Sequence, residues 1–175
     1  KVSDDMEKKV DVVALGELLI DFTENGLSNQ GNQLLEANPG GAPCNVLSML
    51  VNLGKSTAFI GKVGNDFFGK YLKQVVEQVG IDTSSLVMDD SVHTTLAFVH
   101  TFEDGDREFS FYRNPGADMM LSKEDVSEDL IRSARVFHYG TLSSTHEVAR
   151  EATRYALSVA EDAGLLISFD PNLRM

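Results

Sequence analysis

The sequence has few basic residues, a single cysteine and no long apolar run. Its 175 residues include 15 Lys and Arg against 27 Asp and Glu, for a formal net charge of −12. Nucleic-acid binding relies on clustered Lys and Arg at the phosphates, so we expect no nucleic-acid partner. The single Cys44 excludes an intramolecular disulfide and favours a reducing compartment, so we expect a cytoplasmic protein.

Membrane, metal and nucleotide signatures are also missing. No run of about 18 apolar residues occurs, and residues 1–9 lack the apolar part of a signal peptide, so we expect no membrane association. The four histidines show no paired ligand spacing, so no protein-built metal site is predicted. Gly54-Lys55-Ser56 resembles the end of a phosphate-binding loop, but Met49 stands where its first glycine belongs. No dinucleotide glycine fingerprint occurs either, which disfavours a Rossmann protein.

The apolar pattern predicts alternating strands and helices. Residues 10–22 are nearly continuous apolar sequence, interrupted at Gly16-Glu17, and predict one strand buried on both faces, ending at Asp21. Helical spacing over 46–53 and 68–79 predicts two helices that end at glycines. Two capping boxes, Ser122 with Asp125 and Ser144 with Glu147, predict helices near 123–133 and 145–163. With strands at 56–60, 136–139 and 165–169, the order predicts an α/β fold: a parallel sheet with helices on both faces.

One segment departs from this alternation. Residues 94–101 and 107–113 are strand-like and are joined by Glu-Asp-Gly-Asp at 103–106, which predicts a hairpin. Together with a short strand at 33–37, the hairpin would form a small β-sheet that projects from the core and acts as a cover over another part of the molecule.

The glycine pair Gly40-Gly41 is the first candidate for a binding site. Two residues without Cβ allow a ligand to approach the main chain closely, and Pro43 suits the first turn of a helix. The pair therefore indicates a small-molecule cradle, with an ordinary loop as the alternative.

Acidic and aromatic residues supply further candidates. Ligands bind beyond the carboxyl ends of parallel strands, where we expect Asp21 and Asp170, and a carboxylate there would suit a polyol. The alternative for both is a capping or loop acid. Phe109, Phe111 and Arg113 share one strand face by their two-residue period and indicate either a pocket lining or a packed sheet face with a surface arginine.

Seven motifs in order resemble the N-terminal half of ribokinase-like (PfkB-type) carbohydrate kinases, and most of all the bacterial fructokinases among them. Leu47 departs from the family pattern, which prefers a small residue there. The motifs occupy residues 16–22, 38–46, 61–69, 109–113, 116–118, 138–140 and 170–174.

The resemblance implies a sugar site. Asp21 and Asn45 match residues that bind the sugar, and Gly40-Gly41 match a pair that contacts it and flexes as a lid closes. The remaining matches are Phe98, Phe111 and Arg113 in the lid, Arg174 at the pocket mouth, and Asp170 near a phosphate or metal.

The resemblance also implies an ATP- and Mg²⁺-dependent kinase that phosphorylates a ketohexose, fructose to fructose 6-phosphate, and a homodimer formed through the β lid. The family's base lies in a Gly-Ala-Gly-Asp motif that this sequence lacks, so the catalytic residue stays unassigned. We therefore expect residues 1–175 to be the N-terminal part of a longer kinase, with the nucleotide-binding half outside them, and to be inactive alone.

Two alternatives remain. A kinase for 2-keto-3-deoxygluconate or another sugar would also fit, because Arg113 and Arg174 could meet a carboxylate. A non-catalytic sugar-binding module of this length is the second alternative, although an unfinished parallel sheet edge would favour aggregation.

Overall fold

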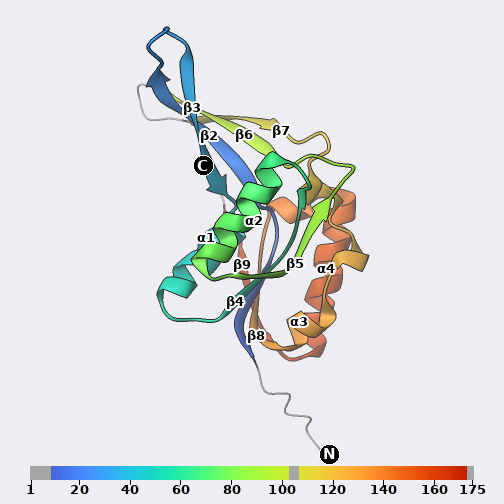
Figure 1. Ribbon diagram of the computed structural model, residues 1–175. Helices are drawn as coiled ribbons and strands as arrows, with labels where there is room; N and C mark the ends of the chain where they lie inside the picture. Colours follow the sequence, from blue (N-terminus) through green and yellow to red (C-terminus); the bar gives the residue numbers. More distant parts are fainter. Residues whose placement is uncertain (1–8, 103–106, 173–175) are drawn as a thin grey trace, which may run out of the picture.

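The computed structural model describes residues 9–102 and 107–172 (Figure 1). Two β-sheets make up the framework: a five-stranded central sheet, and a four-stranded sheet that projects from one end of it. Within the described residues, no helix is long and apolar enough to cross a membrane.

The central sheet is parallel throughout, which confirms the predicted α/β fold. Its strand order is β5-β4-β1-β8-β9, and each neighbouring pair is parallel. The strands are β1 (Val10–Leu15), β4 (Thr57–Gly64), β5 (Asp82–Asp89), β8 (Ala134–Gly140) and β9 (Leu166–Asp170).

Helices cover both faces of this sheet, as the alternation predicted. Strand β1 shows the reason: Val12 and Ala14 join the core on one face, and Val13 and Leu15 join the core on the other. Helices α1 (Ala42–Asn52) and α2 (Phe67–Val79) cover the first face, and α3 (Glu128–Arg132) and α4 (Glu147–Asp162) cover the second. Three short 3₁₀ turns complete the fold: η1 (Ala117–Met120), η2 (Lys123–Asp125) and η3 (Leu142–Ser144).

The projecting sheet, called the lid sheet below, is mixed. Its order is β3-β2-β6-β7, with β2 and β6 parallel in the centre and an antiparallel partner on each side. The predicted small sheet is thus confirmed, while the turn at 103–106 lies outside the described residues. The strands are β2 (Leu19–Leu27), β3 (Gln33–Gly40), β6 (Leu96–Thr101) and β7 (Arg107–Tyr112).

The prediction of one strand over 10–22 was wrong. The chain leaves the central sheet after Leu15 and enters the lid sheet at Leu19, so one apolar run supplies both sheets. Gly16 lies at this crossing, where an added Cβ would come within 2.6 Å of Pro43 Cγ. Apolar content alone could not reveal the crossing, because both strands begin or end in buried surroundings.

The helices in the second half also differ from the prediction. The expected helix over 123–133 is interrupted. The Ser122–Asp125 capping box starts only the short turn η2, and Ser127 caps the separate helix α3 by accepting a hydrogen bond from Leu130 N–H. Ser144 does not cap α4: the N-cap residue of this helix is His146, which makes no side-chain capping hydrogen bond. Strand β5 was not predicted, since its first half is polar and it lies at the sheet edge.

Candidate functional site

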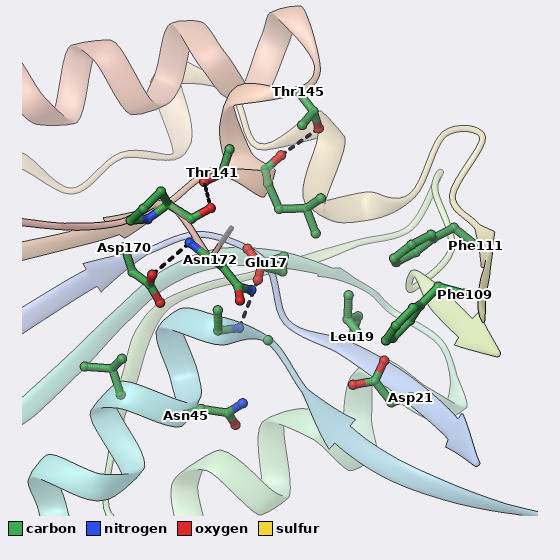
Figure 2. A pocket seen from close by; sticks show the side chains of 15 residues that line it. Glu17, Leu19, Asp21, Asn45, Phe109, Phe111, Thr141, Thr145, Asp170 and Asn172 are labelled. Atoms are coloured by element: carbon green, nitrogen blue, oxygen red, sulfur yellow. Dashed lines mark hydrogen bonds between the residues drawn. The ribbon is translucent and has the colours of Figure 1, made fainter. Parts of the chain in front are cut away.

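A cavity of about 610 Å³ lies where the lid sheet meets the carboxyl ends of the central strands (Figure 2). The start of α1 and the loops after β8 and β9 form one side, and the lid sheet forms the other. The lining residues are Glu17, Leu19, Asp21, Gly41, Ala42, Asn45, Val46, Phe109, Phe111, Thr141, Leu142, Thr145, Asp170, Pro171 and Asn172.

The start of α1 is held by Glu17. Its carboxylate Oε1 accepts a hydrogen bond from Ala42 N–H at 2.9 Å. Gly41 precedes the helix with φ 134°, a conformation that favours glycine, and an added Cβ would collide with the Glu17 carbonyl oxygen. Gly41 also lines the cavity, and its role in holding a ligand stays a prediction. Gly40 does not line it, but its missing Cβ leaves room for the Asp21 carboxylate.

Asp21 and Asn45 reach the cavity from different elements. Asp21 is the third residue of β2 in the lid sheet, so its predicted position at the end of a central strand was wrong. It is half-buried and lies beside Phe109 at the cavity (Figure 2). Asn45 projects from the first turns of α1, and Asp170 ends β9 as predicted, where its Oδ1 accepts from Asn172 N–H at 2.8 Å.

The strand register of the lid sheet decides which aromatic residues face the cavity. Asp21 pairs with Ala97, and Ala97 pairs with Phe111, so these residues share the cavity face. Phe109 and Phe111 stack with ring centroids 6.1 Å apart and line the cavity. Phe98 lies on the opposite face, stacked on Phe22 with centroids 5.0 Å apart, so its predicted place in the pocket was wrong.

Arg113 lies behind the cavity wall instead of lining it. Its guanidinium pairs with Asp118 and also donates to Thr145 Oγ1 and to the carbonyl oxygen of Leu142. Only 10% of its side chain is exposed. Arg174 lies outside the described residues.

Glu17, Thr141, Thr145 and Asn172 are cavity residues that the sequence reasoning missed. Glu17 is 5% exposed; burial raises the pKa of its carboxyl group, and Oε2 has no hydrogen-bond partner in the described part of the chain. An acid inside an apolar run was the available signal for Glu17. The other three lie in loops or turns, which carry no periodic pattern.

The cavity wall is acidic. Three carboxyl groups line it, those of Glu17, Asp21 and Asp170, and no Lys, Arg or His does so among the described residues. Hydroxyl and amide groups of Thr141, Thr145 and the asparagines add neutral hydrogen-bonding sites. This arrangement suits a neutral ligand with several hydroxyl groups.

The described residues do not fit a resident metal ion. They contain no group of three or more His, Cys, Asp or Glu side chains arranged to hold one. The role of Asp170 near a metal or phosphate therefore stays a prediction.

Comparison with known proteins agrees with this fold. Residues 9–175 match the pfkB family carbohydrate kinases. The chain therefore belongs to the pfkB family.

Individual relatives are fructokinases. A probable fructokinase-2 of Arabidopsis thaliana is 48% identical over 166 residues, which are 93% of this chain and 50% of that protein. A fructokinase of Solanum tuberosum is 47% identical over 167 residues, or 94% of this chain and 52% of that protein. The chain thus spans about half the length of these curated relatives.

Two crystal structures of fructokinase from Xylella fastidiosa, one with bound ATP, have the same fold. They are 34% and 33% identical to this chain, each with a TM-score of 0.87. The superposition covers 94% of this chain and 51% and 53% of theirs.

Proposed function

We propose that the full-length protein is a cytoplasmic, ATP-dependent kinase that phosphorylates fructose to fructose 6-phosphate. Relatives named fructokinases at 47% and 48% identity support the reaction. ATP as the donor is supported by the Xylella fastidiosa fructokinase with bound ATP.

The observation that carries this proposal is that hydroxyl-binding groups and aromatic rings line one cavity together. The Asp21 carboxylate can accept hydrogen bonds from two hydroxyl groups, and the Asn45 amide can donate and accept. Phe109 and Phe111 share the lid-sheet face with Asp21, whereas Asn45 comes from α1, and the rings would pack on the C–H surface of the sugar (Figure 2). Their burial on the ligand would also exclude water from the reacting hydroxyl.

The charge of the cavity favours a neutral sugar over a sugar acid. Three carboxyl groups line it, and Arg113, the described residue expected to meet an acid, is paired with Asp118. Like charges repel strongly where water is partly excluded, so 2-keto-3-deoxygluconate should bind less well than fructose.

The proton-accepting base is proposed to lie outside these 175 residues, together with the nucleotide site. The sequence has no Gly-Ala-Gly-Asp motif, and the chain spans about half the length of its relatives. The Mg²⁺ ion expected with ATP would bind there as well, and no step is assigned to it from the described residues.

A homodimer through the lid sheet is proposed from its outer face. Leu35 and Tyr112, on the face opposite the cavity, are 44% and 68% exposed around Phe98. Exposed apolar groups of this kind mark protein interfaces. Sedimentation of the full-length protein should give a dimer, and Tyr112→Glu should shift it toward monomer; a monomeric wild type would contradict the proposal.

The test of function uses the full-length gene product. ATP consumption would be measured with fructose and with 2-keto-3-deoxygluconate, and the product would be identified by mass and by fructose-6-phosphate-specific coupling. We expect turnover of fructose with the higher kcat/KM. Binding of fructose without turnover would favour a sugar-binding module, and turnover of neither a furanose nor a ketose would refute a sugar kinase.

A further inference from the structure

Arg113 and Asp118 form a buried ion pair beside the cavity. The Arg113 Nε and NH2 groups approach Asp118 Oδ2 at 2.8 and 2.7 Å, and the two side chains are 10% and 2% exposed. The other carboxylate oxygen, Oδ1, accepts a hydrogen bond from the Thr95 hydroxyl. Both oxygens of Asp118 are thus engaged, and its negative charge is held against the guanidinium.

The same guanidinium contacts the cavity wall from behind. Its NH1 donates to Thr145 Oγ1 at 3.1 Å, and its NH2 donates to the Leu142 carbonyl at 3.3 Å. Thr145 and Leu142 both line the cavity. The guanidinium of Arg113 therefore lies directly behind two residues of the cavity lining.

The charges of the pair reach the cavity lining. After burial and hydrogen bonding, the pKa of the Glu17 carboxyl group is raised by the negative charge of Asp118 and lowered by the positive charge of Arg113. The two charges of the pair thus act on Glu17 in opposite directions.

An unpaired arginine at this position would have a different effect. A guanidinium stays protonated at every relevant pH and matches a carboxylate with two parallel N–H groups. It would attract the carboxylate of a sugar acid to the cavity. Asp118 supplies a carboxylate from within the protein and occupies the two N–H directions that such a ligand would use.

We propose that Asp118 determines substrate specificity: by neutralising Arg113 it makes the cavity select neutral sugars and reject sugar acids. This inference rests on the proposed sugar-kinase function. It gives Asp118 a role that the sequence motif alone did not suggest.

The main test is Asp118→Asn in the full-length protein. Asparagine has the same shape: its amide oxygen can accept from Arg113 and its NH2 group can donate to Thr95 Oγ1, but the negative charge is gone. We expect the ratio of kcat/KM for fructose to that for 2-keto-3-deoxygluconate to fall at least tenfold, mainly through a lower KM for the acid. Glu147→Gln, an equal charge change at an exposed site of α4, should leave the ratio within twofold of wild type.

Calorimetric binding of 2-keto-3-deoxygluconate without ATP separates this inference from the proposed function. Tighter binding to Asp118→Asn than to wild type supports the role of Asp118 even if neither sugar is turned over. An unchanged ratio and unchanged binding in a folded Asp118→Asn protein would overturn it.

A second variant covers the case in which Asp118→Asn melts below the assay temperature. Thr145→Arg adds an unpaired guanidinium at an exposed position of the cavity wall and leaves Asp118 in place. If the charge of the cavity selects the substrate, Thr145→Arg must show the same fall in the ratio of kcat/KM for fructose to that for 2-keto-3-deoxygluconate. A wild-type ratio in Thr145→Arg would contradict selection by charge.

Discussion

The inner strands of the central sheet and strand β7 of the lid sheet bury their apolar side chains to very different extents. In the central sheet Val13, Ile60 and Phe137 are fully buried, with helices packed on both faces. In the lid sheet Phe111 and Tyr112 are 50% and 68% exposed. The inner strands of the central sheet use apolar groups for stability, and β7 leaves them exposed for the proposed ligand on one face and the proposed partner subunit on the other.

This contrast predicts that substitutions in the central sheet will mainly reduce stability. Phe137→Ala should show the largest effect, a loss of about 3–5 kcal/mol in the free energy of unfolding, because it leaves a cavity in a fully buried core. Denaturant unfolding of the full-length protein would measure it. Leu27→Ala, at a 70% exposed position of the lid sheet, should cost within about 0.5 kcal/mol; equal losses would remove the contrast.

Substitutions on the cavity face of the lid sheet should affect substrate binding instead. Asp21→Ala removes a carboxylate proposed to bind sugar hydroxyls, worth about 1.5–3 kcal/mol, so KM for fructose should rise roughly 10- to 100-fold. Steady-state kinetics would measure it, with Glu36→Gln on exposed β3 as the control. An Asp21→Ala enzyme with unchanged fructose affinity would show that the site is misplaced.

The two faces of the lid sheet should also differ from each other. Phe111→Ala should raise KM for fructose about fivefold, since it removes roughly 1 kcal/mol of apolar contact with the sugar. Phe98→Ala, on the opposite face, should leave KM unchanged. A KM increase of equal size for Phe98→Ala would contradict the strand register that separates them.

The smallest effect should come from Glu17, where the two sheets meet, and it should depend on pH. Burial raises the pKa of Glu17 above its ordinary 4.5, so ionisation above that pH weakens the folded state. Glu17→Gln keeps an acceptor for Ala42 N–H but cannot ionise. The stability of the variant relative to wild type should therefore increase as pH rises from 4.5, as measured by unfolding at several pH values; a constant difference would contradict the shift.

Much of the central sheet could be predicted from the sequence because burial on both faces produces long apolar runs and regular helix spacing. The run over 10–22 shows the limit of this signal: it continues through Gly16 although the strand does not, since both β1 and the start of β2 are buried. Polar, edge-lying β5 gave no such signal.

The site was partly predictable for a related reason. Gly41, Asn45 and Phe111 carry local or family signals and lie at the cavity. Phe98 was misplaced because one residue of register decides its face, and Arg113 because its partner Asp118 follows five residues later in a turn. Register and ion pairing depend on three-dimensional contacts that a residue pattern does not contain.

All four strands of the lid sheet join the rest of the protein at their cavity ends, so the lid sheet has the mechanics of a lever. Strand β2 has nine residues and extends about 30 Å from this attachment, so a rotation of about 10° would move its far end by about 5 Å. The same rotation would move Asp21, two residues from the attachment, by only about 1 Å. Adjustments of about 1 Å at the proposed sugar site would thus appear at the far end as movements of several ångströms, and a spectroscopic label at Leu27 would report them.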